Sequence, residues 1–252
     1  MSDHPAITGI YRYPVKGLNA ERLDDVAVQT GKCIPFDRAF AIENGAQLFD
    51  SENPLFLPKN RFLILMSHER LAKLDAQFDD ETQSLTIMRD GKQVARGCLN
   101  DRIGRQLLEQ FFSAYMVKEL HGAPRIVHAP GHSFADVPTQ YISMINLASV
   151  RELERVVGKA VDPLRFRANL YVDGLAPWVE ADWQNERIGA SAGVLFRSDG
   201  PIERCAAINV DPATGERDLS LPRSLMQAYG HMNMGVYLEV VTGGRIATGD
   251  PI

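Results

Sequence analysis

The chain has 252 residues, of which 45% are hydrophobic and 23% are charged, and its formal net charge is −5. This composition is typical of a globular protein and excludes a disordered or collagen-like chain. The negative net charge also argues against nucleic acid as a partner, because nucleic-acid-binding proteins carry a positive field.

Nothing in the sequence has the pattern of a membrane or secretion segment. The longest apolar run covers residues 62–66, whereas a membrane span needs about 20 apolar residues, so we expect no membrane span. Asp3 stands where a signal peptide has basic residues, which predicts a cytoplasmic protein. Three cysteines without a C-x-x-C pair argue against a disulfide framework and against zinc-finger spacing: Cys33, Cys98 and Cys205.

Short apolar segments broken by turn residues dominate the first 100 residues and predict strands. They include residues 7–15, 24–31 and 39–49. The Asn-Gly pair at residues 44–45 predicts a type I′ hairpin within the third segment. The Asp-Gly pair at residues 90–91 predicts another hairpin, because apolar and polar residues alternate before it.

Two stretches of the same half have helical spacing. Ser67 is the expected cap of the first helix, and Asp101 is the expected cap of the second. The apolar residues that these helices would bury are Leu71, Leu74 and Phe78 in the first, and Ile103, Leu107, Leu108, Phe111 and Tyr115 in the second.

The second half begins after a segment, residues 122–138, whose Pro, Gly and His content predicts a long connection and a domain boundary. A helix should follow, with Asn146 as its cap and Gly158 as its end. Its inward residues would be Leu147, Val150, Leu153 and Val157. Strands are predicted within residues 169–174, 187–200, 202–211 and 235–250, the last folding back on itself at residues 243–244.

These elements predict the fold class. Many short strands with few helices, and no sustained strand-helix alternation, favour a β-rich α+β protein with two barrel-like β domains and a few peripheral helices. The sequence contains no G-x-G-x-x-G or Walker motif. Dinucleotide and nucleoside-triphosphate chemistry therefore lack their usual signatures.

Cys205 and four basic residues are candidates for chemistry. Arg204 precedes Cys205, and a neighbouring cation favours the thiolate, although a lone cysteine on a strand is more often a small buried hydrophobe. Lys16, Arg38 and Arg167 are far from Arg204 in sequence, so all four could meet only in the folded chain. Together they would bind phosphate, whereas separately each would be an ordinary surface charge.

The histidines give weaker signals. His128 and His132 have the spacing of a zinc pair on a helix, but Pro130 and Gly131 between them break that helix, so we expect loop residues. His231 could line a site or serve as a capping or surface residue, and the sequence leaves both open.

Five segments occur together in the order found in MOSC proteins: YRYPVKGL, IPFDRAFAI, FRANLYVDG, IERCAAINVDPATGERDL and GVYLEVVTGGRIATGD. The chain resembles that family along nearly its whole length. Residues 5–120 look like the MOSC N-terminal β-barrel domain, and residues 130–252 look like the MOSC domain. Within the family, the chain resembles mitochondrial amidoxime-reducing components and their bacterial counterparts.

The resemblance implies a molybdenum–molybdopterin cofactor and an oxidoreductase that reduces N-hydroxylated or N-oxide-like small molecules. Cys205 matches the catalytic thiolate that ligates the metal, a role that suits a soft ligand. The chain has no further cysteines for an iron–sulfur cluster, so electrons would come from a separate reductase or ferredoxin-like protein. The positions that match pterin- and phosphate-binding residues are Lys16, Arg38, Asn146, Arg167, Asn169, Arg204 and Tyr237.

Two other readings stay open at this point. The protein could carry the cofactor, or carry sulfur on Cys205, without turning over a substrate; a pyridoxal-phosphate-dependent desulfurase domain is absent, so sulfur would be delivered by another protein. Alternatively, it could be a β-rich binding protein that has lost its metal. The chain also departs from the amidoxime reducers at Gly17, where they have serine, so one side-chain contact to the pterin is lost or becomes a backbone contact.

Overall fold

The computed structural model describes residues 4–45 and 47–252. These residues form strands β1 (Ala6–Arg12), β2 (Glu21–Leu23), β3 (Asp25–Val28), β4 (Phe40–Asn44), β5 (Asp75–Asp79), β6 (Ser84–Arg89), β7 (Lys92–Cys98), β8 (Pro124–His128), β9 (Ile142–Asn146), β10 (Leu170–Asp173), β11 (Arg187–Gly189), β12 (Leu195–Glu203), β13 (Asn233–Thr242) and β14 (Gly244–Ala247). The α-helices are α1 (Arg102–Tyr115), α2 (Leu147–Val157) and α3 (Leu221–Tyr229). Short 3-10 helices are η1 (Lys59–Arg61), η2 (Glu69–Lys73), η3 (Pro163–Phe166), η4 (Val179–Asp182), η5 (Ser191–Gly193) and η6 (Ala206–Asn209). The predicted β-rich α+β class is confirmed.

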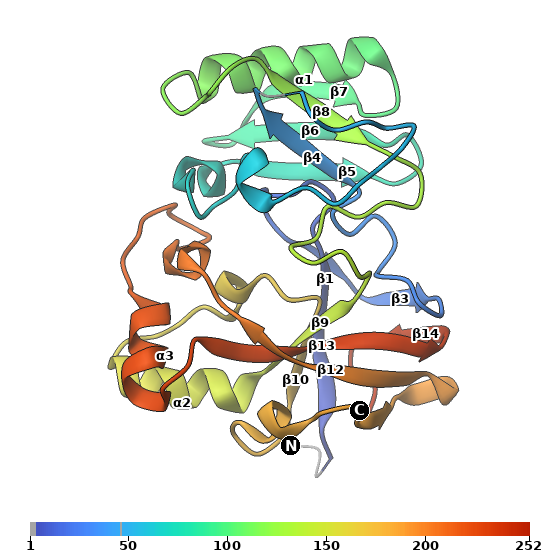
Figure 1. Ribbon diagram of the computed structural model, residues 1–252, viewed down its shortest axis with the longest axis vertical. Coiled ribbons are helices and arrows are strands. Elements are labelled where there is room, and N and C mark those ends of the chain that lie inside the picture. Colours follow the sequence, from blue (N-terminus) through green and yellow to red (C-terminus); the bar gives the residue numbers. More distant parts are fainter. Residues whose placement is uncertain (1–3, 46) are drawn as a thin grey trace.

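The lower half of the molecule in Figure 1 is built on a seven-stranded sheet with the order β11-β12-β13-β9-β10-β1-β2. Alternate residues of β12 are buried, as expected for a strand with one face on the core. Helix α2 contacts β9, β10 and α3. The strand order is open at both ends, so hydrogen bonds among the described residues do not close this sheet into a complete barrel.

The upper half contains the sheets β4-β8 and β5-β6-β7, with α1 at the top of the view (Figure 1). Leu108 and Phe112 of α1 are fully buried against Leu85 and Ile87 of β6 in one apolar cluster. The helix lies very close to β7, because a Cβ placed on Gly104 would collide with the backbone of Cys98. This half has its own core, separate from that of the seven-stranded sheet.

The first strands of the chain belong to the lower half. Strand β1 lies between β10 and β2 in the large sheet, and β3 pairs antiparallel with β14. The chain then enters the upper half at β4 and returns through the connection between β8 and β9. The division into residues 5–120 and 130–252 therefore remains a proposal. It did not anticipate that the N-terminal strands β1, β2 and β3 pair with strands of the C-terminal half and with each other.

One of the two predicted hairpins is confirmed. Strands β6 and β7 pair antiparallel, and Asp90 and Gly91 both have positive φ angles, 51° and 74°, as a type I′ turn requires. The hairpin at residues 44–45 is wrong, because β4 pairs with β8 from a distant part of the sequence. Glu43 instead accepts hydrogen bonds from the backbone N–H groups of Leu48 and Phe49, which replaces strand pairing after the turn.

The predicted caps of the longer helices are confirmed. Asp101 accepts a hydrogen bond from Gly104 N at 2.6 Å, Asn146 caps α2, and Gly158 ends it with a φ of 70°. Ser67 was the wrong cap, because the residues after it form a 3-10 helix that His68 precedes, and Phe78 lies in β5. Two further residues expected to be buried are exposed on α1: Ile103 and Leu107.

Three other predictions from the second half differ from the structure. The connection at residues 122–138 contains β8, which pairs with β4. Residues 206–209 form η6, so Cys205 immediately precedes a helical turn and is separated from the end of β12 by Arg204, rather than lying within a strand. The last strand does not fold back onto β13, because β14 instead covers the edge of β3.

Candidate functional site

A cavity of about 420 Å³ lies between the two halves of the molecule. Met66, which packs with Ala41 and Val127 of the upper half, and Tyr237 of β13 in the lower half both line it. The sequence-predicted residues that the structure brings together here are Lys16, Arg38, Arg167, Asn169, Arg204, Cys205 and Tyr237. Residues separated by more than 200 positions in the sequence therefore share one cavity.

Asn146 is the one predicted site residue that does not line the cavity. It is fully buried at the start of α2, where its side-chain oxygen accepts a hydrogen bond from Ala148 N at 2.9 Å. Its side-chain nitrogen donates to the Ala176 carbonyl and to Glu180 Oε2, both at 2.8 Å. The polar side-chain groups of Asn146 therefore hold the start of α2 in place and do not face a ligand in the cavity.

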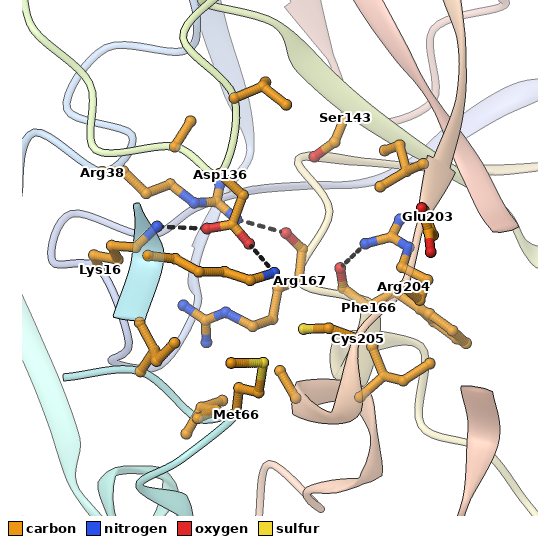
Figure 2. Close-up of a pocket in the computed structure, with 18 of the residues that line it drawn as sticks. Lys16, Arg38, Met66, Asp136, Ser143, Phe166, Arg167, Glu203, Arg204 and Cys205 are labelled. Atoms are coloured by element: carbon orange, nitrogen blue, oxygen red, sulfur yellow. Dashed lines mark hydrogen bonds and ion pairs between the residues drawn. The ribbon is translucent and has the colours of Figure 1, made fainter. Parts of the chain in front are cut away.

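Cys205 lies at the junction of β12 and η6, and it is partly exposed. Figure 2 shows its sulfur directed toward the side of the cavity that carries Arg167. Lys59 lines the cavity near this sulfur: burial acts to lower the pKa of Lys59, but the nearby Asp136 and Cys205 more than offset that effect, so the pKa is raised. A thiol beside a lysine and open to a cavity can act as a metal ligand.

Lys16 lines the cavity but is buried, with 5% of its surface exposed. Its Nζ donates to the Phe134 carbonyl at 2.7 Å and to Asp136 Oδ1 at 2.5 Å. Burial lowers the pKa of Lys16, and Asp136 opposes that effect. Burial acts to raise the pKa of Asp136, but Lys16 and Lys59 lower it well below its usual range.

Arg38 and Arg167 contact the same aromatic ring. Their guanidinium carbons lie 4.3 and 4.4 Å from the ring centroid of Tyr13, which is buried. Arg38 binds both carboxylate oxygens of Asp37. Its Nη2 donates to the Arg167 carbonyl at 2.7 Å (Figure 2). Both arginines have left-handed backbones, with φ angles of 50° and 52°, and such strain is typical of functional sites.

Arg204 has an unused hydrogen-bond donor. Its Nε donates to the Met234 carbonyl and its Nη1 to the Phe166 carbonyl, both at 2.8 Å, while its buried Nη2 has no partner. Burial lowers the pKa of Arg204, and it lowers that of Arg167 to about 10. Within the described chain, neither arginine forms an ion pair with a carboxylate. Removing a cation even partly from water without an anion beside it is unfavourable, so these two partly buried side chains fit an anionic ligand.

The cavity as a whole is positive although the protein is negative. Its acidic lining residues are Asp37, Asp136 and Glu203. Its basic lining residues are Lys16, Arg38, Lys59, Arg165, Arg167 and Arg204. Such local concentration of positive charge can attract an anion that the overall charge of −5 would repel.

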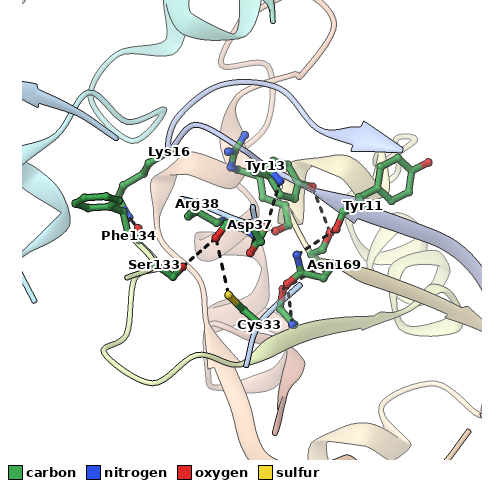
Figure 3. A network of polar contacts seen from close by, with 12 residues as sticks. Tyr11, Tyr13, Lys16, Cys33, Asp37, Arg38, Ser133, Phe134 and Asn169 are labelled. Carbon is green, nitrogen blue, oxygen red and sulfur yellow. Dashed lines mark hydrogen bonds and ion pairs between the residues drawn. The ribbon is translucent and has the colours of Figure 1, made fainter. Parts of the chain in front are cut away.

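Asn169 and Gly17 shape the wall and offer few free side-chain groups. The Asn169 side chain accepts from Ser143 N and Oγ and donates to the Tyr11 carbonyl, so it ties β9 to β1 (Figure 3). Gly17 has a φ of 90°, and a Cβ at this position would collide with the Leu63 carbonyl. Any contact from Gly17 to a ligand must therefore come from its backbone.

Sequence reasoning missed Tyr13, Lys59 and Asp136. Tyr13 lies close to Lys16 in the segment YRYPVKGL, so the position of Tyr13 next to a predicted site residue could have identified it. Lys59 and Asp136 lie in a 3-10 turn and an irregular segment, where no periodicity marks them. His231 does not line the cavity, since its ring packs near Trp178 and Tyr229.

Comparisons with known proteins point to one family. The family model described as the MOSC domain matches residues 118–252. The molybdenum cofactor sulfurase of Anopheles gambiae is 39% identical over 276 residues, covering 94% of this chain and 34% of that protein. Molybdenum cofactor sulfurase 2 of Culex quinquefasciatus is 26% identical, covering 95% of this chain and 35% of that protein. The chain thus spans about a third of the length of these relatives.

The human molybdenum cofactor sulfurase is 22% identical over 92% of this chain and 30% of its own length. Among solved structures, the YUAD protein from Bacillus subtilis has 14% identity and a TM-score of 0.45, covering 98% of this chain and 93% of that chain. Among the described residues, no helix is both long and apolar enough to span a membrane.

Proposed function

Because the chain belongs to the MOSC domain family, we propose that its cavity binds a molybdenum–molybdopterin cofactor and that the protein is a molybdenum-dependent oxidoreductase. Its substrates would be N-hydroxylated or N-oxide-like small molecules. The observation that carries this proposal is the pair of partly buried arginines, Arg167 and Arg204, which line the cavity without a carboxylate partner among the described residues. The phosphate of a molybdopterin would supply the missing anion.

In this proposal, Cys205 ligates the metal and the basic residues hold the cofactor. A thiolate is a soft ligand suited to molybdenum, and Cys205 opens into the cavity. Lys16, Arg38, Arg167 and Arg204 bind the phosphate and pterin, with Asn169 and Tyr237 forming the wall. When bound, the cofactor supplies the two-electron chemistry that removes an oxygen atom from the substrate.

The residues of the chain contribute binding, orientation and electrostatics. The ring of Tyr13 fixes Arg38 and Arg167, and the carbonyls of Phe166 and Met234 fix Arg204. This preorganisation lets the cations meet the ligand without first reorienting. Electrons would come from a separate reductase or ferredoxin-like protein.

Metal analysis tests the assignment of Cys205. Protein from a host that makes the cofactor should contain molybdenum and pterin, and Cys205→Ser should lose most of the molybdenum because a hydroxyl is a poorer soft-metal ligand. Cys33→Ser and Cys98→Ser are matched controls, because neither residue lines the cavity. Equal molybdenum in wild type and Cys205→Ser would rule out ligation by this sulfur.

A second function, transport of the cofactor or of sulfur on Cys205 without substrate turnover, is favoured by the sulfurase names of the relatives. The two functions differ in turnover. The molybdenum-loaded reductase, given a chemical electron donor, should convert hydroxylamines, amidoximes or N-oxides to the reduced compounds. A loaded protein that leaves all three untouched would exclude the reductase and support the carrier.

A further inference from the structure

Asp136 places a carboxylate inside the cluster of cations. Its Oδ1 accepts from Lys16 Nζ at 2.5 Å, and its Oδ2 accepts from Lys59 Nζ at 3.2 Å (Figure 2). The residue comes from the irregular connection between β8 and β9, and Ala135, Val137 and Thr139 of this connection also line the cavity. The contact therefore joins a connecting segment to the cations of the binding site.

Lys16 needs this partner when no other anion is present. Only 6% of its side chain is exposed, whereas 47% of the Asp136 side chain is exposed. A buried ammonium without a counter-ion is unfavourable, and the Phe134 carbonyl is its other hydrogen-bond partner. The lysine is thus fixed in the wall, and the carboxylate is the accessible member of the pair.

We propose that Asp136 is a displaceable counter-ion that determines which anions the cavity accepts, admitting phosphate groups and rejecting singly charged carboxylates. The inference rests on the proposed function because it takes a phosphate-bearing ligand for the cavity. An entering anion must compete for Lys16 and Lys59 with a carboxylate that is part of the same chain. Such an intramolecular competitor acts at an effective concentration of about millimolar or above.

The selectivity follows from what each anion gains. A free carboxylate would replace the Asp136 carboxylate with an equivalent group, so the net binding free energy would be small. A phosphate has more charge and more acceptor oxygens, so it can contact both lysines and keep an oxygen for a further cation of the cavity lining, such as Arg167. Only phosphate therefore gains more binding free energy than is lost when the ion pairs of Asp136 with Lys16 and Lys59 break.

Calorimetric titration of cofactor-free protein with inorganic phosphate and with acetate tests this inference. Wild type should bind phosphate measurably more tightly than acetate. Asp136→Asn removes the competing charge, so we expect phosphate affinity to rise about tenfold or more and acetate binding to become detectable. The ratio of phosphate to acetate affinity should therefore fall in this variant.

Glu203→Gln is the matched control. Glu203 lines the same cavity and carries the same charge, but it forms no ion pair with Lys16 or Lys59. We expect a change in phosphate affinity of less than about twofold, since screening weakens the effect of an exposed charge. Equal gains in both variants would show a general charge effect and would overturn the inference, as would no gain in Asp136→Asn.

Hydrogen exchange on the wild type gives an answer that does not depend on how a variant folds. Saturating phosphate should release Asp136 and loosen the connection, which should speed exchange of the neighbouring Phe134 amide that donates to the Arg38 carbonyl at 2.7 Å, whereas acetate should not. Unchanged or slower exchange of this amide with phosphate would contradict displacement. Failure of this inference is distinguishable from failure of the proposed function, because the proposed function is tested by molybdenum content and by Cys205→Ser.

Discussion

At the scale of single residues, the site depends on side chains that position other side chains. Tyr13 is an example, because its buried ring contacts the guanidinium groups of Arg38 and Arg167. Its backbone N–H also donates to Asp37, which in turn binds Arg38. One residue therefore sets the position of two cations that would otherwise repel each other.

Tyr13→Leu should weaken phosphate binding to the cofactor-free protein by about tenfold, because each cation–π contact contributes about 0.5–2 kcal/mol. Tyr13→Phe keeps the ring and should stay close to wild type. Calorimetry with inorganic phosphate measures both variants. Equal losses in the two would mean that the hydroxyl, rather than the ring, matters.

Cys33 should react slowly with thiol reagents in the folded protein. Burial, together with the charge of Asp37, raises the pKa of Cys33 to about 11. At pH 8 it should hold about a hundredfold less thiolate than a thiol of ordinary pKa, so iodoacetamide should modify it far more slowly in the folded protein than in urea. Peptide mass spectrometry follows each cysteine. Equal rates for Cys33 in the folded and unfolded chain would refute its shifted pKa.

At the scale of elements, the sequence predicted local features better than distant ones. Caps such as Asp101 and Gly158, and the turn at residues 90–91, depend on neighbours within a few positions, and all are confirmed. The partners of β3 and β4 lie far along the chain, so local patterns did not reveal them. The same holds for the cavity: the cations were recognised through a family resemblance, whereas Asp136 and Lys59 became apparent only in the folded chain.

Gly104 provides a test of packing between elements. Its Cα lies against the backbone of Cys98, where a methyl group has no room. Gly104→Ala should therefore lower the free energy of unfolding by about 1–3 kcal/mol, despite the better helix propensity of alanine. Urea denaturation measures this, with Gln110→Ala on the exposed face of α1 as a control within about 0.5 kcal/mol of wild type. A stabilised Gly104→Ala would contradict the close packing of α1 on β7.

At the scale of the whole molecule, the cavity exists only where the two halves meet. Arg217 connects them beside the site. Its Nη2 donates to the carbonyls of Leu65 and Met66 in the upper half at 2.9 and 2.8 Å, and its Nη1 donates to the Ala206 carbonyl next to Cys205 at 3.1 Å. This guanidinium therefore holds two walls of the cavity in register.

Arg217→Ala should reduce the free energy of unfolding by about 1–2 kcal/mol through its lost hydrogen bonds. It should also speed amide exchange in residues 65–69 and 206–209 together, because the same side chain holds both segments. Arg155→Ala removes an exposed ion pair within α2 and should change stability by less than about 0.5 kcal/mol. Faster exchange in only one of the two segments would disprove the connection.

The central claim is that one sulfur and a group of distant cations hold a molybdenum cofactor between the two halves. Anomalous X-ray diffraction at the molybdenum absorption edge, on crystals of protein purified from a host that makes the cofactor, tests it most directly. We expect a single anomalous peak in the cavity, within bonding distance of Cys205 Sγ. A well-ordered crystal of the loaded protein with its molybdenum peak elsewhere, or with none in the cavity, would contradict the account.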